Sequence, residues 1–391
     1  MSAVGIIGRC VLERVALVGC PDYERGRVEE AVARAFELLG GPGAVVGRGE
    51  SVFLKVNALM PYDPEKMVTT HPEVVRAVVL QLDGIAGSVT IGDSPGGPFT
   101  PSFLKRFYDR AGFARVAEET GADLGYDTGV MHLKVPDAGV MKVVPVCGAM
   151  VKADRLINLP KFKTHMFMNI TGAVKNLFGA VPGMYKLSFH SRFHKDSDFA
   201  NLLVDAALAA DADLHIVDAV VGQDRNGPRA GDIKPMGVIA AGPDAFAVDS
   251  AMMAVIGKTP KANKPLAAAM SRGLTAGDLS DVELLGDSVE ELAVHGFRMP
   301  DKKDIAEYVP EFIMQRFGSM MSLRPRPAEG RCTGCGKCAE LCPAGAITVV
   351  GRLARVDLKK CLRCYCCHEL CEFDAVELDR PLLLRLVRAR G

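Results

Sequence analysis

Several residue types and sequence features are scarce or absent in this chain. It has no Trp, aromatic residues make up 6% of its 391 residues, and Lys+Arg and Asp+Glu both number 47, which gives a formal net charge of +0. A chain with neither a basic excess nor abundant stacking aromatics lacks a general nucleic-acid surface. No apolar run approaches the roughly 20 residues of a membrane-spanning helix, and the N-terminus lacks the pattern of a secretory signal. We therefore expect a cytoplasmic protein with no nucleic-acid or membrane partner, and the sequence leaves its oligomeric state open.

Cysteine, in contrast, is concentrated at one end. Of the 12 Cys residues, nine lie from Cys332 onward, and only Cys10, Cys20 and Cys147 precede them. Thiols in a cytoplasmic protein stay reduced, so such crowding favours metal ligation over disulfide bonds.

The C-terminal cysteines form two copies of one motif, C-x2-C-x2-C-x3-C, which is typical of bacterial two-cluster ferredoxins. In that arrangement the fourth Cys of each run ligates the other cluster. The spacing predicts two [4Fe–4S] clusters, and two structural zinc sites fit the interleaved order much less well. The expected ligand sets are Cys332, Cys335, Cys338 and Cys371 for one cluster, and Cys342, Cys361, Cys364 and Cys367 for the other.

Two further features of this region bear on the clusters. Gly334 and Gly336 allow the backbone to approach a cluster closely, so that N–H groups can bond to its sulfurs. Cys366 is an additional cysteine beside the ligand Cys367. A small side chain packed beside the loop explains Cys366 better than a replacement ligand does.

The rest of the chain predicts one α/β domain. Residues 1–300 form this domain, 301–327 a helical and Pro-rich linker, 328–380 the ferredoxin module and 381–391 a helical tail. Short apolar runs alternate with helical patterns, which favours a mostly parallel sheet with helices on both faces. The expected strands are 15–18, 52–56, 89–91, 140–146, 155–159, 214–220 and 238–241, and the expected helices are 27–39, 72–82, 102–111, 202–210, 245–256 and 304–317.

Polar residues gather where these strands end, which is where ligands lie in open α/β sheets. Lys55 closes one strand, the loop 92–98 with Asp93, Gly96 and Gly97 follows another, and Asp218 ends a third. Backbone amides of the 92–98 loop and the following helix could hold an anion, although a structural Gly/Pro turn is an equal alternative. Buried capping carboxylates are the plain alternative for Asp93 and Asp218.

Residues 158–194 carry cations in apolar, Gly-rich surroundings, whereas solvated lysines normally lie among polar residues. Such a cluster, with nearby amides, suits a carboxylate or phosphate, and we favour this over lysine stems that merely reach out of a core segment. We expect His165, Lys163 and Asp218 to act in catalysis, with His165 as proton donor. The expected anion-binding residues are Lys55, Asp93, Gly96, Gly97, Lys161, Lys175, Asn176, His190 and Asn226.

An ordered set of these motifs resembles the domain of unknown function 362 family, whose members are often fused to a ferredoxin module. The resemblance covers most of residues 10–290 and implies no assigned activity or catalytic residues. The segments that carry it are 55–57, 69–75, 92–97, 159–165, 171–179 and 226–231.

The leading hypothesis is an iron–sulfur oxidoreductase that receives electrons from a redox partner or donor and passes them to a small anionic ligand in the α/β domain. A second hypothesis is an electron-transfer or docking partner of a larger redox enzyme, without catalysis of its own. A third is a metal-dependent, non-redox enzyme in which His190 and His194 hold a metal with Asp196 or Asp198, and the clusters are structural.

Overall fold

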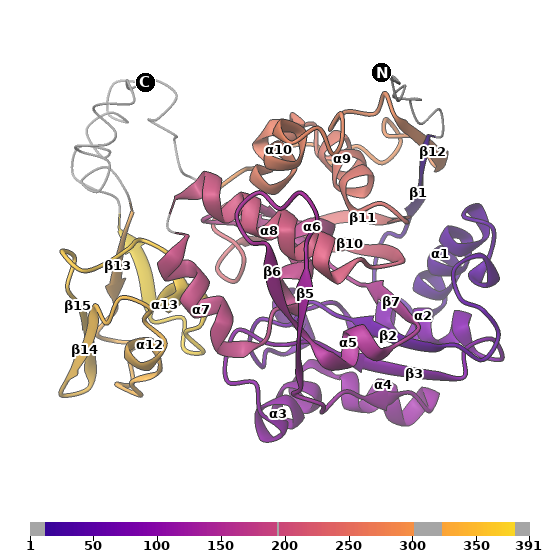
Figure 1. Cartoon of the computed structure of the whole chain (residues 1–391). Helices are drawn as coiled ribbons and strands as arrows, with labels where there is room; N and C mark the ends of the chain where they lie inside the picture. Colours follow the sequence, from indigo (N-terminus) through magenta and orange to yellow (C-terminus); the bar gives the residue numbers. More distant parts are fainter. Residues whose placement is uncertain (1–11, 194, 301–322, 380–391) are drawn as a thin grey trace, which may run out of the picture.

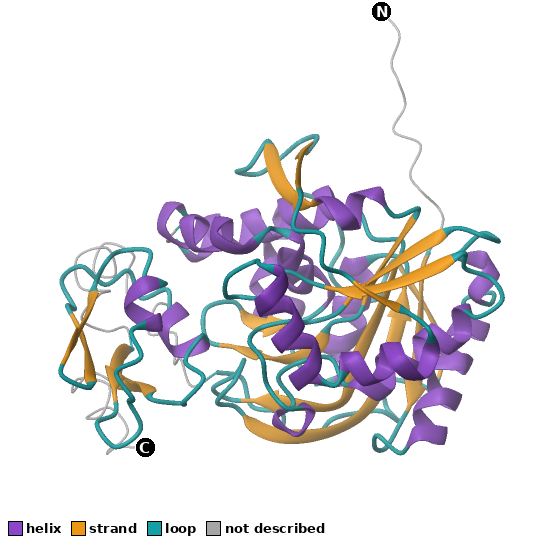
Figure 2. Ribbon diagram, turned by 90° about the horizontal axis from the view of Figure 1, so that it is seen from below, coloured by secondary structure: helices purple, strands orange, loops and turns teal. Residues whose placement is uncertain are grey.

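The computed structural model describes residues 12–193, 195–300 and 323–379. A large α/β domain carries a small module at one side (Figures 1 and 2). The strands of the large domain are β1 (Glu13–Gly19), β2 (Ser51–Lys55), β3 (Ser88–Gly92), β4 (Asp123–Leu124), β5 (Val130–Lys134), β6 (Val143–Cys147), β7 (Arg155–Asn158), β8 (Lys161–His165), β9 (Asn169–Thr171), β10 (Leu214–Asp224), β11 (Asp232–Gly242) and β12 (Val282–Gly286). Its α-helices are α1 (Arg25–Leu38), α2 (Pro72–Leu82), α3 (Pro101–Ala111), α4 (Phe113–Thr120), α5 (Gly148–Lys152), α6 (Ala173–Asn176), α7 (Gly183–Arg192), α8 (Asp196–Ala210), α9 (Ala245–Val255) and α10 (Lys264–Ser271).

The main sheet runs in the order β12-β1-β11-β10-β7-β2-β3-β4, and β8 and β9 extend it beside β10. Neighbours are parallel except where β11 pairs with β1 and β10, and where β9 pairs with β8. The predicted fold class, a mostly parallel sheet with helices on both faces, is confirmed.

Strand alternation divides the core into two layers. Along β1, Ala16 and Val18 join the layer under α1, α2 and α3, whereas Val15 and Leu17 join the layer under α6, α8 and α9. This is the period-two pattern of a sheet buried on both faces.

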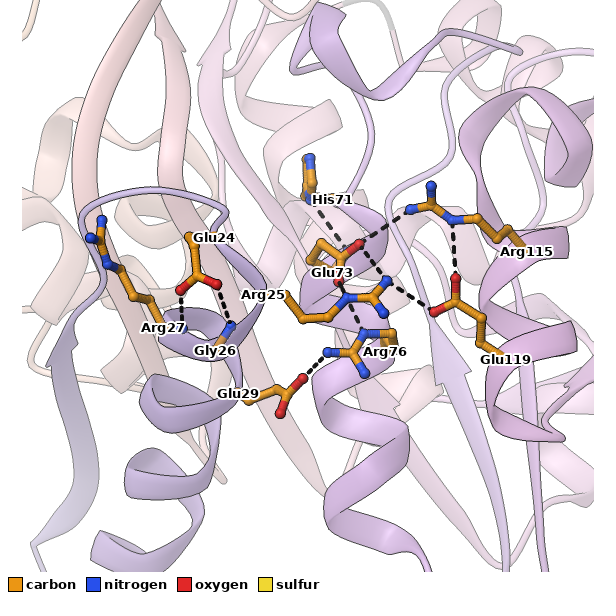
Figure 3. Close-up of polar contacts among 10 residues, drawn as sticks. All are labelled: Glu24, Arg25, Gly26, Arg27, Glu29, His71, Glu73, Arg76, Arg115 and Glu119. Carbon is orange, nitrogen blue, oxygen red and sulfur yellow. Dashed lines mark hydrogen bonds and ion pairs between the residues drawn. The ribbon is translucent and has the colours of Figure 1, made fainter.

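Ion pairs link the helices of the first layer (Figure 3). Glu73 on α2 accepts from Arg25 at the start of α1, from Arg76 one turn along α2, and from Arg115 on α4. Arg25 also pairs with Glu119 of α4 at 3.0 Å. Because several charges share one only slightly exposed carboxylate, this network fixes α1, α2 and α4 better than isolated surface pairs would.

A buried ion pair joins β8 to β10. The register pairs Lys161 directly with Asp218, and Lys161 Nζ lies 2.9 Å from Asp218 Oδ2, with both side chains fully buried. The second carboxylate oxygen accepts from the hydroxyl of Tyr23 at 2.7 Å, and the backbone N–H of His71 donates to the first at 2.9 Å. This pair therefore ties the strand that carries Lys163 and His165 to the centre of the sheet.

The small module is an α+β unit, as expected. Its two-stranded sheets are β13 with β16 and β14 with β15, both antiparallel. Its elements are β13 (Arg324–Pro327), α12 (Lys337–Glu340), β14 (Ile347–Val350), β15 (Leu353–Val356), α13 (Cys366–Glu369) and β16 (Val376–Asp379).

The two cysteine loops repeat each other in backbone as well as in sequence. Gly334, Gly336 and Gly345 have φ of 71°, 79° and 57°, and the residues 29 positions later, Arg363, Tyr365 and Asp374, have φ of 60°, 61° and 51°. The left-handed region is costly for a residue with a Cβ. Both loops therefore adopt left-handed backbone at the same three positions, even where the residue is not glycine.

The predicted elements of the α/β domain are present, although α8 and β11 each begin six residues before their predicted starts. Residues 325–327, expected as part of the Pro-rich linker, form strand β13 of the module. The sequence pattern gave no assignment for β4, β5, β8, β9, β12, α4, α5, α6, α7 and α10. The expected helix 304–317 and the tail 381–391 lie outside the described residues.

Replacing Asp218 with Ala would leave the Lys161 ammonium buried without its partner. We expect the free energy of unfolding to fall by about 3–5 kcal/mol, measured by urea denaturation with circular dichroism. The double variant Asp218→Leu/Lys161→Met, which removes both charges, should recover most of that loss. A cost below about 1 kcal/mol for Asp218→Ala would contradict a structural role for the pair.

Two glycines of the first cysteine loop offer a matched comparison. A Cβ on Gly334 would lie 2.7 Å from the Cα of Arg352, whereas a Cβ on Gly336 would meet nothing within 4 Å. Both substitutions carry the left-handed penalty of about 1–2 kcal/mol, so Gly334→Ala should lower iron content and thermal stability more than Gly336→Ala. Equal losses would show that the contact with Arg352 is unimportant.

Candidate functional site

A cavity lies between the α/β domain and the module. It opens at the ends of β2, β3 and β8, and α7 and α13 supply further walls. The residues that line it are Asn57, Ala58, Leu59, Asp93, Gly96, Lys163, His165, Thr171, Lys175, Asn176, Phe178, Gly179, Lys186, Leu187, His190, Phe199, Pro228, Cys366, Glu369 and Leu370.

Two of the buried lysines near the cavity are neutralised by carboxylates. Lys55 Nζ lies 3.0 Å from Asp93 Oδ1, with both side chains buried, and Lys161 pairs with Asp218 as described above. Burial lowers the pKa of both lysines, and the paired carboxylates oppose that shift. Neither lysine lines the cavity, so both act as supports of its floor.

Two other lysines line the cavity and bond to neutral oxygens. Lys163 donates to Asn57 Oδ1 at 2.6 Å and to the Val68 carbonyl, and Lys186 donates to the carbonyls of Ser94 and Pro95. Burial lowers the pKa of Lys163 well below its usual value, and the charges of Lys175 and Lys161 lower it further. Burial lowers the pKa of Lys186 to about 8. An anion in the cavity would offset this desolvation of the ammonium groups.

Three polar groups on the cavity wall have no protein partner within the described part of the chain. Lys175 Nζ makes no hydrogen bond or ion pair there, and Thr171 Oγ1 and His190 Nδ1 are buried and unsatisfied. Burial lowers the pKa of Lys175 to about 8 and that of His190 to about 4. Buried polar atoms without partners are rare and call for an explanation, and a bound polar ligand supplies one.

A chain of amides fixes the polar floor of the cavity. Asn57 donates to Asn176 at 2.6 Å, and Asn176 donates to Asn158 at 2.8 Å. Asn158 in turn lies 3.0 Å from Nδ1 of the buried His215. Because Lys163 donates to the first amide of this chain, its ammonium group is held in one position.

His165 connects the α/β domain to the module. Its Nδ1 accepts from the backbone N–H groups of Phe167 and Met168, both at 3.1 Å, so the neutral ring carries its proton on Nε2. Nε2 lies 3.1 Å from Glu369 Oε1. Burial would raise the pKa of Glu369, but His165, Lys175 and His190 outweigh burial and lower it to about 2.

One wall of the cavity is aromatic. The His190 ring stacks on Phe199 with centroids 4.4 Å apart, and Phe178 meets both rings edge-on. A ligand in this cavity would therefore meet an aromatic surface as well as the lysines.

The module docks directly over the cavity. Arg229 donates to the His368 carbonyl at 2.7 Å and pairs with Asp374, and the Tyr62 hydroxyl donates to the Cys371 carbonyl at 3.2 Å. A Cβ at Gly96 would lie 2.6 Å from Leu370 Cδ2 and 3.1 Å from the Leu59 carbonyl, so a larger residue there would force the Leu370 side chain to move.

The cysteine residues of the module fit an iron–sulfur cofactor. A pocket is lined by all four cysteines of one predicted set, Cys332, Cys335, Cys338 and Cys371. All four are free thiols. No three His, Cys, Asp or Glu residues of the described ranges converge closely enough to ligate one metal ion, and a cluster separates its four ligands more widely than an ion does.

Backbone groups also point to cluster ligation. The N–H groups of Ala346, Ala354 and Ala375 donate to the sulfurs of Cys342, Cys332 and Cys371 at 3.3–3.4 Å. The first and last of these repeat at a spacing of 29 residues. Such N–H···S bonds tune the potential of iron–sulfur clusters.

The structure brings many of the predicted site residues together at the cavity and places others around it. Lys163, His165, Lys175, Asn176, His190, Asp93 and Gly96 line it, whereas Lys55, Gly97, Lys161, Asp218 and Asn226 do not. Asp218 lies in the buried pair beneath. His194 lies outside the described residues, and Asp196 pairs with Lys264, so a metal on His190 and His194 stays a prediction.

Sequence reasoning missed several groups of the cavity. Thr171 carried no signal of its own, and the aromatic wall of Phe178 and Phe199 looked like ordinary core. The module's contribution, Cys366, Glu369 and Leu370, required knowledge of how the two parts dock. Asn57, two residues after Lys55 at the same strand end, was recognised as part of a motif but was not among the expected site residues.

Comparison with known proteins places both parts of the chain. The family model described as a domain of unknown function (DUF362) matches residues 52–254, and a 4Fe-4S binding domain matches residues 327–348. A thylakoid-associated protein of Synechocystis sp. is 32% identical over 305 residues, which span 74% of this chain and 89% of that protein. No helix among the described residues is long and apolar enough to cross a membrane.

Two other similarities are more limited. One component of an ion-translocating oxidoreductase complex of Methanosarcina acetivorans is 49% identical over 47 residues, 12% of this chain and 18% of that protein. The lactate racemase apoprotein of Thermoanaerobacterium thermosaccharolyticum aligns with a TM-score of 0.38 and 17% identity over 60% of this chain and 55% of that structure. The family model matches more than half of this chain, and the chain covers 89% of the Synechocystis relative. The chain therefore belongs to the domain of unknown function 362 family and carries a C-terminal 4Fe-4S binding domain.

Proposed function

We propose that this protein is an iron–sulfur oxidoreductase whose module holds two [4Fe–4S] clusters and supplies electrons to a small organic anion in the interdomain cavity. The observation that carries the proposal is that one segment of the module both lines the cavity and holds expected cluster ligands. Cys366, Glu369 and Leu370 line the cavity, and they alternate in sequence with the expected ligands Cys364, Cys367 and Cys371. A ligand in the cavity would therefore contact the peptide segment that holds a cluster.

Two clusters are supported by the repeated geometry of the module. Both cysteine loops adopt left-handed backbone at equivalent positions. The half-buried Cys367 lies close to other thiols of its expected set, and desolvation followed by the charges of Cys364 and Cys361 raises its pKa well above the usual value. Thiols packed this closely are stable as thiolates only with bound metal. When bound, the clusters supply single electrons.

The charge of the cavity suits an anion. Lys163, Lys175 and Lys186 line it, and Glu369 is the carboxylate that faces them without a lysine partner of its own. The half-buried Lys175 makes no hydrogen bond or ion pair with another described residue, and Thr171 Oγ1 is buried without a partner. The aromatic side chains of Phe178 and Phe199 favour an organic anion with an apolar body over bare phosphate.

The chain's own residues divide the remaining work. Lys175 and Thr171 hold the anionic group, and the amide chain fixes Lys163 beside it. His165 is neutral, with Nδ1 accepting two backbone N–H groups and Nε2–H facing Glu369, so it orients that carboxylate instead of giving a proton to the ligand. A two-electron reduction would need one electron from each cluster, an external carrier as the reductant, and two protons, which the ammonium groups of Lys175 and Lys186 could deliver from solvent because their pKa values are about 8.

A docking partner without catalysis of its own is the second candidate. The buried polar atoms of the cavity that lack a protein partner, Thr171 Oγ1 and His190 Nδ1, favour the oxidoreductase, because a pure electron carrier has no use for such a site.

Iron content tests the number of clusters. Protein purified without oxygen should contain about eight iron atoms per chain, two cubes of four. Cys361→Ser should lower this to about four, because it removes a ligand of one set, while Cys366→Ser should leave it unchanged. A wild-type content of about four, measured by metal analysis and native mass spectrometry, would contradict the two-cluster arrangement.

A single-turnover experiment tests the site. Protein reduced without oxygen and freed of excess reductant should be reoxidised by the anionic fraction of a small-molecule cell extract, followed as recovery of the visible cluster absorption. Lys175→Met should slow this by at least about tenfold, since one lost charge contact is worth about 1.5–3 kcal/mol. The control Lys134→Met, an exposed lysine of β5, should leave the rate unchanged. Equal rates in all three proteins would refute the cavity as the site.

The same reaction should depend on pH. The pKa of Lys175 and that of Lys186 are each about 8, so both are charged below that value and lose their charge as pH rises through it. Anion affinity, measured as the concentration of extract that gives half-maximal reoxidation, should therefore weaken above about pH 8.

A further inference from the structure

The proposed function leaves open how electrons reach the module, and the surface around the first cysteine loop bears on this. Residues 352–363 carry five cationic side chains and a single carboxylate, Asp357. Arg352, Arg355, Lys359 and Lys360 are exposed. None of these four forms an ion pair with another described residue. We call them the basic edge.

Most other cations of the module are neutralised, which sets the basic edge apart. Arg326 and Arg331 pair with Glu377, and Lys337 pairs with Glu372. The carboxylate of Asp357 accepts a backbone N–H from Lys359 and so caps its own turn. The positive charge of the basic edge is therefore not compensated locally, and its field extends into solvent.

The basic edge is also in contact with the cluster loop. A Cβ on Gly334 would lie 2.7 Å from Arg352 Cα, so the two backbones touch. Ala354, between the two arginines, donates its N–H to Cys332 Sγ at 3.4 Å. Cys335 of the same loop is exposed, which leaves little protein between this set of ligands and the surface.

Apolar side chains lie in and beside the same segment. Val350, at the end of β14, is 56% exposed, and Leu358, between Asp357 and Lys359, is 39% exposed. Exposed apolar residues next to a mostly basic surface are typical of small, transient interfaces, in which electrostatics accelerates association.

We propose that the basic edge is the docking site of a small, acidic electron-carrier protein. Electrons would enter at the Cys332 set and leave toward the cavity, whose wall belongs to the second half of the repeat. The carrier is oxidised by one electron and the cluster it meets is reduced by one, so each encounter is balanced. Docking at this edge leaves the interdomain cavity uncovered, and this inference therefore stands even if the cavity binds no substrate.

The test uses the intact, cluster-loaded chain and an acidic flavodoxin as the probe. Lys359→Glu/Lys360→Glu should weaken flavodoxin binding by at least about tenfold at low ionic strength, measured by titration calorimetry, because like charges would then face each other. The wild-type affinity should itself fall as salt is added. Cluster bleaching by reduced flavodoxin should slow in parallel.

A matched control carries the same change of charge elsewhere. Lys134→Glu/Lys142→Glu alters two exposed lysines on the β5–β6 hairpin, and neither forms an ion pair with another described residue. This control should bind flavodoxin as the wild type does. Reduction by methyl viologen, a small cation that needs no docking surface, should proceed in both variants at the wild-type rate.

Three results would overturn the proposal. One is equal flavodoxin binding in the wild type and in Lys359→Glu/Lys360→Glu. Another is equal weakening in both charge-reversal variants, which would indicate a general effect of net charge. The third is a loss of binding to vesicles of phosphatidylcholine and phosphatidylglycerol without any loss toward flavodoxin, which would assign the edge to an anionic membrane surface.

Discussion

The cost of burying an ammonium group organises this protein around one end of its sheet. Taking such a charge out of water costs several kcal/mol unless an opposite charge or good hydrogen bonds replace the water. The structure meets this requirement in three ways. Lys55 and Lys161 have carboxylates, Lys163 and Lys186 have neutral oxygens, and Lys175 has no protein partner among the described residues. The first group supports the cavity, the second shapes it, and the third is where a ligand is most needed.

This sorting explains which parts of the site could be predicted from the sequence. Lysines in an apolar segment are conspicuous, so the region around Lys163 and Lys175 could be recognised without a structure. The difference between Lys161 and Lys163 could not. The two lie two residues apart on one strand, and only the register with β10 separates them, because it places Asp218 opposite the first and Gln223 opposite the second. The pairing of distant strands decides which lysine meets a carboxylate.

Much of the fold could be predicted from the sequence because most elements follow a regular apolar pattern. Helix α2 (Pro72–Leu82) begins at a proline and follows a clear apolar period, and its predicted ends match those observed. Strands β8 and β9 and helix α6 follow no such period, since Gly, Asn and Lys interrupt them and their burial comes from contacts across the sheet. The docking of the module depends on Arg229 and Gly96, whose partners lie more than 130 residues away in the chain.

The module is built as two matching halves that serve different neighbours. Left-handed positions occupied by glycine in the first half are occupied by Arg363 and Tyr365 in the second. Tyr365 is buried at the start of α13, the helix that faces the cavity, whereas the first loop stays near the surface. The second half has thus taken on contacts with the α/β domain, and the first has kept the smaller residues of an exposed loop.

The position of α13 has a consequence for how the protein matures. The helix that closes the cavity begins with Cys366 and contains Cys367, an expected cluster ligand, and Cys364 precedes it by two residues. If Cys364 and Cys367 ligate the second cluster as proposed, a newly made chain without iron and sulfide would lack the bonds that hold this short helix, and with it one wall of the cavity. Assembly of that cofactor and completion of the cavity would then be a single event, and oxidative loss of the cofactor would dismantle both together.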